Sequence, residues 1–304
     1  MAGPAFRAAP VRVRVPATSA NLGPGFDALG LALGLYDDVV VRVADRGLAI
    51  DIAGEGADTL GRDENHLVVR ALYAAFEALG GRPGGLEIVC ANRIPHGRGL
   101  GSSAAAICAG VVAARALTIG GAERLDDAAA LAVATALEGH PDNVAACLYG
   151  GFTTAWTDED GPHAVRSMPH ADIAPVVFVP STPLSTEVAR GLLPAQVPHA
   201  EAAVNAGRAA LLVTALTERP DLLLPATDDR LHQDYRAPAM PHSAELVAKL
   251  RGQGHAAVIS GAGPTVLALV TADHVDEVIG AADTNWVATR LDVDTEGAGV
   301  LPLG

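Results

Sequence analysis

The segment 93–106, Arg-Ile-Pro-His-Gly-Arg-Gly-Leu-Gly-Ser-Ser-Ala-Ala-Ala, restricts the fold of this chain more than any other. Its three glycines predict a turn in which the backbone can approach an anion without side-chain clashes. Ser102 and Ser103 then open an alanine-rich helix, predicted over residues 102–118, whose first N–H groups carry partial positive charge. An apolar, strand-like run precedes the turn. The segment therefore predicts a phosphate-binding strand, turn and helix, although a plain turn before a helix has the same local pattern.

The loop lacks the lysine on which many nucleotide sites depend. It does not carry the Gly-x4-Gly-Lys-Ser/Thr pattern, and Lys249, the single lysine of the chain, lies far from it in the sequence. The strand lysine of protein kinases is absent for the same reason. Negative charge on a nucleotide must therefore be met by backbone amides, arginine and a metal ion, with the hydroxyl of Ser103 as a natural metal ligand.

Composition restricts the class of protein and its surroundings. With 304 residues and 50% hydrophobic content, the chain can form packed cores in two domains or in one large one. Its formal net charge of −14 argues against nucleic acid or an anionic membrane as the main partner. Neither a signal peptide nor a membrane-spanning run is recognisable, so we expect a cytoplasmic protein. Cys90, Cys108 and Cys147 lie in apolar sequence and are expected to be buried thiols.

Hydrophobic periodicity and turn residues predict an α+β arrangement. The first part of the chain has more predicted strands than a doubly wound sheet, in which strands and helices alternate, would have. Pro16 is expected to end the first strand, and residues 21–27 are expected to form a turn-rich loop. The predicted strands cover residues 11–15, 38–43, 48–52, 86–90, 150–156 and 176–179, with a strand, a glycine turn and a strand over 255–270. The predicted helices cover residues 65–79, 102–118, 126–137, 144–148, 186–193, 200–216 and 243–251.

Three separated segments carry a resemblance to a known superfamily. They are Pro-Ala-Thr-Ser-Ala-Asn-Leu-Gly-Pro-Gly-Phe-Asp over 16–27, Pro-His-Gly-Arg-Gly-Leu-Gly-Ser-Ser-Ala-Ala over 95–105, and Ile-Ser-Gly-Ala-Gly-Pro-Thr over 259–265. In this order they resemble the motifs of the GHMP kinases, named for galactokinase, homoserine kinase, mevalonate kinase and phosphomevalonate kinase. The first segment and Glu-Gly-His-Pro-Asp-Asn over 138–143 resemble the homoserine kinases among them. The resemblance covers residues 11–270.

The resemblance implies a two-domain α+β fold and an activity. The implied N-terminal domain, at residues 1–160, binds ATP and is ribosomal-protein-like with a left-handed βαβ crossover. The implied C-terminal domain, at residues 161–304, is ferredoxin-like, and the active site lies between the two. The implied reaction is ATP- and Mg²⁺-dependent phosphorylation of the side-chain hydroxyl of L-homoserine, a step toward threonine, by a homodimer. A GHMP kinase acting on another small alcohol, and a non-catalytic sensor of the same fold, are the alternatives.

The resemblance also implies which residues bind nucleotide and metal. Ser103 and Glu138 would hold Mg²⁺, since a hard cation prefers oxygen ligands. The alternative for Glu138 is a solvated carboxylate at the end of a helix. Asn65 matches a position that contacts adenine. The implied nucleotide set is Asn65, Pro95, Gly97, Arg98, Gly99, Leu100, Gly101, Ser102, Ser103 and Ala104.

For the amino-acid substrate, the resemblance implies an arginine clamp on its carboxylate. Arg190 matches one substrate arginine, and Thr186, one turn earlier, matches a residue near the reacting hydroxyl. A second arginine is expected near residues 230–236, where we favour Arg230 over Arg236, although either is also compatible with a surface charge. Asn21, Asp27, His140, Asn143 and Gly263 complete the implied substrate set. Turn chemistry alone would also explain Asn21 and Gly263. His140 also suits an ordinary loop.

One position bears on how the proton of the substrate hydroxyl leaves. Mevalonate-type enzymes place an aspartate there, whereas the resemblance places Asn143, which cannot act as a general base. Transfer would then depend on alignment and on electrostatic stabilisation of the phosphoryl group by Mg²⁺ and loop amides. Asp142 is adjacent and remains the alternative base.

Overall fold

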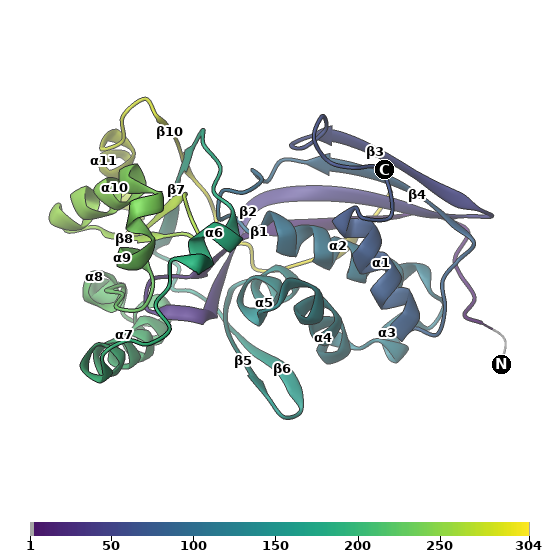
Figure 1. The fold of residues 1–304 in the computed structure, drawn as a ribbon, viewed down its shortest axis with the longest axis horizontal. Helices are drawn as coiled ribbons and strands as arrows, with labels where there is room; N and C mark the ends of the chain where they lie inside the picture. Colours follow the sequence, from purple (N-terminus) through teal and green to yellow (C-terminus); the bar gives the residue numbers. More distant parts are fainter. Residues whose placement is uncertain (1–2, 304) are drawn as a thin grey trace.

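Two β-sheets organise the computed structural model, which describes residues 3–303, and they stand end to end along the molecule (Figure 1). The first has seven strands in the order β11-β1-β2-β4-β3, with β5 paired with β2 and β6 with β5. It contains β1 Val11–Asn21, β2 Gly25–Ala44, β3 Gly47–Gly54, β4 Gly85–Asn92, β5 Phe152–Asp158, β6 Gly161–Ser167 and β11 Gly299–Leu301. The second has the order β10-β7-β9-β8 and contains β7 Ile173–Pro180, β8 Ala256–Ile259, β9 Val266–Thr271 and β10 Trp286–Arg290.

A layer of helices covers one face of the first sheet (Figure 1). They are α1 Leu67–Ala78, α2 Ser102–Leu117, α3 Gly121–Arg124, α4 Asp127–Glu138 and α5 Pro141–Tyr149. The second sheet is accompanied by α6 Thr186–Gly191, α7 His199–Thr217, α8 Leu223–Ala226, α9 Gln233–Arg236, α10 Pro241–Gly252 and α11 Val275–Gly280. None of the helices between residues 3 and 303 combines the length and the apolar character needed to cross a membrane.

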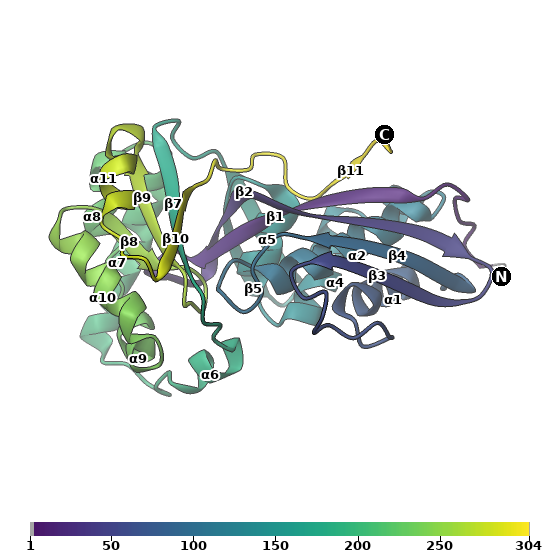
Figure 2. The same cartoon turned by 90° about the horizontal axis from the view of Figure 1, so that it is seen from above.

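The first sheet is built on the long antiparallel pair β1 and β2. The predicted end of the first strand at Pro16 is wrong, because β1 continues through the proline to Asn21. A register shift between Pro16 and Ala17 accommodates it, since an irregular pairing does not need the N–H that proline lacks. The loop predicted over residues 21–27 shrinks to a tight turn, in which Asn21 pairs with Gly25. This turn lies at the junction with the second unit (Figure 2).

The predicted strand, glycine turn and helix are confirmed as β4, the loop 93–101 and α2. Parallel strands β3 and β4 are joined through α1, which gives the βαβ crossover that the resemblance implied. The left-handed sense of that crossover stays a prediction. Helix α2 is buried along most of its length and packs on α1, where a Cβ on Gly110 would come within 2.6 Å of the Ala71 side chain. Small residues therefore let α2 run through the core.

The second unit has the predicted ferredoxin-like arrangement. All neighbouring strands are antiparallel in the order β10-β7-β9-β8, and helical segments join β7 to β8 and β9 to β10. Leu212 and Leu216 of α7, together with Val258 and Leu267 of the sheet, belong to the apolar core that also fills the first unit. The two units therefore share packed apolar contacts.

The chain crosses between the two sheets twice. The boundary predicted after residue 160 falls in the turn between β5 and β6, and both strands belong to the first sheet. The chain reaches the second sheet at β7 and returns after β10, where Val293 bridges to Leu33 and β11 pairs with β1 (Figure 2). We call residues 291–301 the return strap. The second unit is thus inserted between β6 and β11.

Candidate active site

Two cavities meet where α2 begins. The larger, which we call the side cavity, has a volume of about 410 Å³ and lies beside the starts of α1 and α2. The smaller, which we call the cleft, has a volume of about 190 Å³ and is lined by residues of both units. Ser102 and Ser103 line both cavities, so one elongated ligand can occupy the two at once. A nucleoside in the side cavity would place its phosphates at the cleft.

The glycine loop between the cavities has the backbone conformation that the sequence predicted. Gly97, Gly99 and Gly101 have φ angles of 64°, 74° and 70°, in the left-handed region that other residues avoid. A Cβ on Gly99 would overlap the carbonyl oxygen of Ser260, and a Cβ on Gly101 would overlap the hydroxyl of Thr18. These positions therefore admit only glycine, and the loop lies close against segments from both units.

Ser103 and Glu138 lie together on the wall of the cleft. The Ser103 hydroxyl donates to Oε2 of Glu138 over 2.6 Å, which joins the start of α2 to the end of α4. Burial raises the pKa of Glu138, and the hydrogen bond from Ser103 offsets only part of that rise. A hydroxyl and a carboxylate are oxygen donors of the kind that Mg²⁺ prefers, and a cation would favour the ionised carboxylate. The two residues fit a magnesium ion.

The turn between β1 and β2 forms another wall of the cleft and is strained. Asn21, Leu22 and Asp27 have φ angles of 68°, 51° and 54°, although none of them is glycine. The Asn21 side chain accepts a hydrogen bond from the Asp27 N–H over 2.9 Å and donates to the Gly261 carbonyl over 2.9 Å. Strained backbone of this kind persists where surrounding contacts hold it, often at functional sites. Here one contact is internal to the hairpin end, and the other comes from Gly261 in the predicted motif 259–265.

Two arginines reach the cleft, and their surroundings differ. Arg190 makes a bidentate ion pair with Asp27, with Nη2 to Oδ1 at 2.6 Å and Nη1 to Oδ2 at 3.2 Å. Arg236 is only 1% exposed and donates to the carbonyls of Ala189 and Gly261, each over 3.3 Å. Within residues 3–303, no carboxylate lies within 4.0 Å of the Arg236 guanidinium. Burial, reinforced by the charge of Arg190, lowers the pKa of Arg236.

Of Arg230, which sequence reasoning favoured, and Arg236, the structure places Arg236 at the cleft. Arg230 points away from the cleft and forms ion pairs with Asp228 at 3.1 Å and with Glu201 at 3.8 Å. Its side chain is 44% exposed, as expected of a surface charge. Arg236, six residues later, lines the cleft instead.

The segment 138–143 contributes three further side chains to the cleft. His140 Nδ1 lies 2.6 Å from Oδ1 of Asp142, and the same oxygen accepts the Asn143 N–H over 2.8 Å. Burial opposes protonation of His140, but the hydrogen bond to Asp142 and its charge outweigh burial and raise the pKa of His140. The amide oxygen of Asn143 accepts from the Thr18 hydroxyl over 2.8 Å. Among the described residues, the Asn143 amide nitrogen has no protein partner, so it remains free to donate to a ligand.

Most predicted site residues line the two cavities. The side cavity receives Asn65, and the cleft receives Asn21, Gly97, Gly99, Gly101, Ser102, Ser103, Glu138, His140, Asn143, Thr186 and Arg190. Seven predicted residues line neither cavity: Asp27, Pro95, Arg98, Leu100, Ala104, Arg230 and Gly263. Leu100 and Ala104 are buried in the core, and Arg98 donates to the Pro180 carbonyl over 3.0 Å. Gly263 lies behind Gly99.

Several cavity residues were missed by sequence reasoning. Gly261 and Ala262, rather than Gly263, present the glycine turn of the motif 259–265 to the cleft. Asp142 also lines the cleft, although it was considered only as a base. His66 lines the side cavity next to Asn65, is 7% exposed, and neither of its ring nitrogens has a hydrogen-bond partner in the described residues. In the sequence, the only signal that could have identified these residues was their position next to the predicted motif residues.

Comparison with known proteins shows the family. Family models match residues 66–151 as GHMP kinases N terminal domain and residues 200–288 as GHMP kinases C terminal. A homoserine kinase of Streptomyces coelicolor is 72% identical over 100% of this chain and 98% of that protein, and one of Clavibacter michiganensis is 52% identical over 95% and 93%. The crystal structure of homoserine kinase from Cytophaga hutchinsonii matches with a TM-score of 0.84 and 27% identity, over 99% of this chain and 100% of the other. The chain therefore belongs to the homoserine kinase family of the GHMP kinases.

Proposed function

We propose that the protein transfers the γ-phosphoryl group of ATP to the side-chain hydroxyl of L-homoserine. The observation that carries this proposal is the pair of arginines in the cleft. Arg236 is a buried cation with no acidic partner among the described residues, beside Arg190, which is paired with Asp27. A small ligand with both a carboxylate and an ammonium group suits such a site, because each end finds the opposite charge. The family membership supports homoserine as that ligand.

The nucleotide would bind across both cavities. Asn65 lies in the side cavity, where the adenine would bind, and the phosphates would reach the loop 97–101 and the first turn of α2. This position supports phosphate binding because α2 has 16 residues and its N-terminal N–H groups face the site without a lysine nearby. Ser103 and Glu138 would hold Mg²⁺. When bound, Mg²⁺ neutralises charge on the phosphates.

Arg190 and Arg236 would bind the substrate carboxylate, while Asp27 would attract its ammonium group. Asn21 would help hold this end of the substrate. Thr186 begins α6 on the opposite wall, near the place where the substrate hydroxyl would lie.

The proton of the hydroxyl has no dedicated protein base in this proposal. One oxygen of Asp142 is already engaged by His140 and by the Asn143 N–H, so the carboxylate serves to orient these two residues. The free amide nitrogen of Asn143 would donate to the substrate oxygen rather than remove its proton. Alignment and electrostatic stabilisation would supply the rate enhancement, as the loose transition state of phosphoryl transfer allows. A cytoplasmic location and a homodimeric state of the protein stay predictions.

An ADP-release assay across a panel of alcohols tests the proposal. We expect turnover with L-homoserine to exceed turnover with L-serine, L-threonine, mevalonate and galactose, and ³¹P NMR should identify O-phospho-L-homoserine as the product. ADP release with L-homoserine no faster than with mevalonate, galactose or buffer alone would refute the substrate assignment.

A further inference from the structure

We propose that His232 is a positioning residue, whose neutral imidazole holds Arg236 at the cleft and ties it to the turn between β1 and β2. The proposal rests on the proposed function, because Arg236 is taken there as a ligand of the substrate carboxylate. His232 immediately precedes α9 and its side chain is fully buried. It does not line the cleft itself, so any effect on substrate must pass through Arg236.

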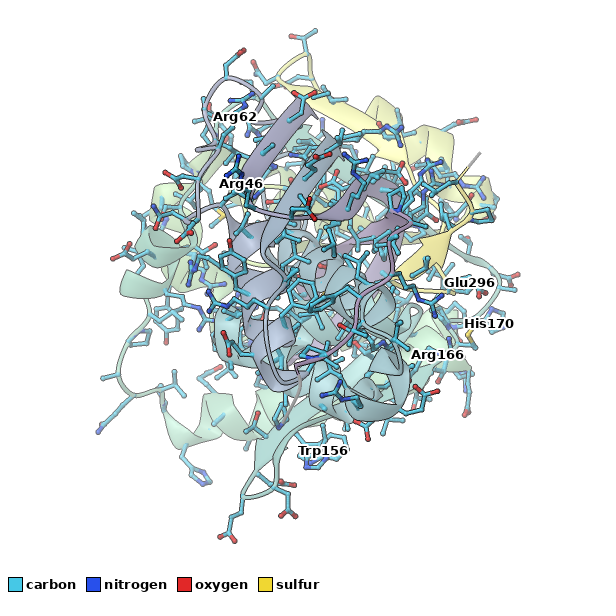
Figure 3. All side chains as sticks on the ribbon, turned by 90° about the vertical axis from the view of Figure 1, so that its right-hand side faces the viewer. Arg46, Arg62, Trp156, Arg166, His170 and Glu296 are labelled. Carbon is cyan, nitrogen blue, oxygen red and sulfur yellow. The ribbon has the colours of Figure 1, made fainter. Side chains whose placement is uncertain are left out.

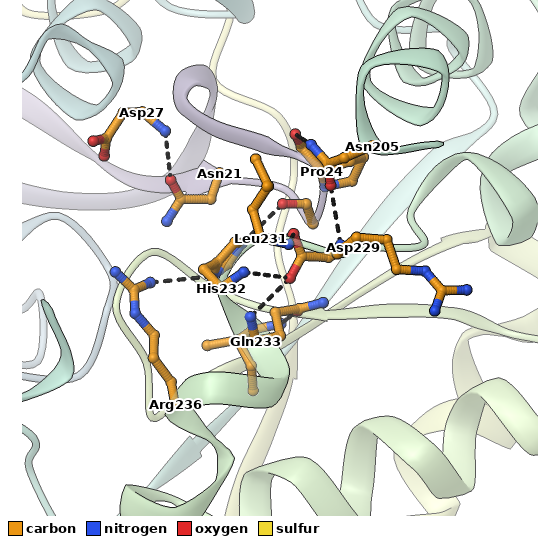
Figure 4. A network of polar contacts seen from close by, with 12 residues as sticks. Asn21, Pro24, Asp27, Asn205, Asp229, Leu231, His232, Gln233 and Arg236 are labelled. Atoms are coloured by element: carbon orange, nitrogen blue, oxygen red, sulfur yellow. Dashed lines mark hydrogen bonds and ion pairs between the residues drawn. The ribbon is translucent and has the colours of Figure 1, made fainter. Parts of the chain in front are cut away.

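The hydrogen bonds of the imidazole determine its protonation (Figure 4). His232 Nε2 lies 2.8 Å from the Gly23 carbonyl oxygen, and Nδ1 lies 3.1 Å from Nη1 of Arg236. A carbonyl can only accept, so Nε2 must carry the proton. A guanidinium can only donate, so Nδ1 must be unprotonated. Both contacts therefore exist together only in the neutral ring with its proton on Nε2.

The neutral state of His232 matters, because a charged group at this position would either pair with Arg236 or repel it. A carboxylate there would form an ion pair with Arg236 and cancel the charge that the substrate needs. A protonated imidazole would lose the acceptor and repel the guanidinium. Burial lowers the pKa of His232, which supports the neutral form. The nearest acid is Asp229. Its carboxylate accepts hydrogen bonds from the backbone N–H groups of Leu231, His232 and Gln233, and it therefore caps the start of α9.

Phe26 completes the arrangement. Its ring centroid lies 5.2 Å from that of His232, 5.4 Å from Cζ of Arg236 and 5.6 Å from Cζ of Arg190. The ring lies within cation–π range of both guanidinium groups, which otherwise repel each other. Gly23 lies in the β1–β2 turn and Phe26 lies at the start of β2, so His232 fixes Arg236 relative to the same end of this hairpin that carries Asn21 and Asp27. The two units are thereby held in register around the substrate.

Steady-state kinetics of His232→Phe, His232→Gln and Arg236→Ala test the positioning role. His232→Phe removes both hydrogen bonds and should raise the KM for L-homoserine about tenfold, with kcat and the KM for ATP within about twofold of wild type. Glutamine offers one donor and one acceptor, so His232→Gln should recover most of the loss. In the Arg236→Ala background, His232→Phe should have no further effect on this KM, because its route to substrate is gone.

His255 provides a matched control, since it is also a buried histidine, 7% exposed, next to β8 and outside both cavities. His255→Phe should leave both KM values unchanged. Two results would overturn the proposal: a joint rise of both KM values in His232→Phe, or losses that add in the double variant.

A second measurement needs neither turnover nor a folded variant. In the ¹⁵N imidazole spectrum of the wild-type protein, His232 should show a protonated Nε2 and an unprotonated Nδ1, and should keep this form when the pH falls to 6.5, the ordinary pKa of an imidazole. A charged ring or a proton on Nδ1 at neutral pH would overturn the proposal even in an active kinase. Conversely, the predicted spectrum in a protein that does not phosphorylate L-homoserine would refute the proposed function alone.

Discussion

At the residue scale, the two arginines of the cleft differ in how their charge is compensated. Arg190 is matched by the carboxylate of Asp27, whereas Arg236 is buried among neutral acceptors. A buried guanidinium without counter-charge is unfavourable unless a ligand supplies one. The folded protein therefore holds Arg236 ready for a carboxylate, and little of the free energy of binding is lost in organising it.

Replacing Arg236 by Ala should raise the KM for L-homoserine roughly 10- to 100-fold, because a hydrogen bond to a charged group contributes about 1.5–3 kcal/mol. The KM for ATP should change little. Arg230→Ala is the control, since its ion pair with Asp228 lies outside the cleft, and its kinetics should match those of wild type. Steady-state kinetics with each substrate varied in turn measure both variants. Equal losses in the two would contradict the assignment of Arg236.

Replacing Glu138 by Gln should lower kcat by at least about a hundredfold while the protein remains folded, because the proposed ligand of Mg²⁺ is lost. The thermal stability of the metal-free protein should not fall in the way that kcat does. Burial raises the pKa of Glu138 above its ordinary value of 4.5, so without metal the wild type loses stability as pH rises from that value through the raised pKa. At pH 7 the metal-free variant should melt at or above the wild-type temperature. Thermal unfolding against pH, with and without Mg²⁺ and ATP, measures this; a metal-free variant less stable than wild type at pH 7 contradicts it.

Predictability at this scale depends on whether the constraint is local. Gly99 and Gly101 were predictable, because a turn with positive φ angles is a local requirement that favours glycine. The choice between Arg230 and Arg236 was not, because contacts with distant segments decide which one faces the cleft. Arg236 is held by His232, which is itself held by the carbonyl of Gly23. Nothing in the local spacing around residue 236 encodes that contact.

At the element scale, helices were predicted more accurately than strands. The predicted helix over 102–118 appears as α2 Ser102–Leu117, because helical periodicity is a local property of the sequence. Strand β1 instead runs past Pro16, since pairing with β2 decides its length. The short strand β11 carried no usable pattern of its own and exists through its partner β1. Sequence reasoning therefore shortened or missed strands that depend on distant partners, and it also missed the short helices α3, α8, α9 and α11.

Two Gly→Ala changes should have opposite effects on stability. Gly101→Ala places a Cβ against Thr18 in the left-handed region and should destabilise the protein by more than about 2 kcal/mol, with loss of ATP binding. Gly207 lies exposed in α7, where an added Cβ meets nothing, so Gly207→Ala should stabilise by about 0.5–1 kcal/mol. Urea denaturation compares the two. A Gly101→Ala protein as stable as wild type would contradict the proposed packing of the loop.

At the scale of the whole molecule, the return strap joins the end of the second unit to the first. Asp294 is 7% exposed, and its carboxylate accepts hydrogen bonds from the Gly297 N–H at 2.6 Å and the Tyr36 hydroxyl at 2.9 Å. Arg166 donates to the carbonyl of Thr295 over 3.1 Å. Figure 3 shows Arg166 and Glu296 close together on this side of the molecule. The strap is therefore held by specific polar contacts as well as by β11.

Replacing Asp294 by Ala should lower the free energy of unfolding by about 2–4 kcal/mol, because it leaves the Tyr36 hydroxyl and backbone N–H groups without a partner. Asp292→Ala is the control, since Asp292 is exposed and its side chain makes no hydrogen bond within residues 3–303. Chemical denaturation of the two variants measures the difference. Equal stability of the two proteins would show that the strap contributes little.

The position of β11 has a consequence for synthesis of the chain. Arg12 at the start of β1 pairs with Leu301, so one edge of the first sheet stays open until β11 has been translated. The second unit, being inserted, is made while that edge is still exposed. Open strand edges invite pairing with other nascent chains, which chaperones normally limit. Ribosome-bound chains that lack the return strap should therefore bind chaperones, and chains in which β11 has emerged should no longer bind them.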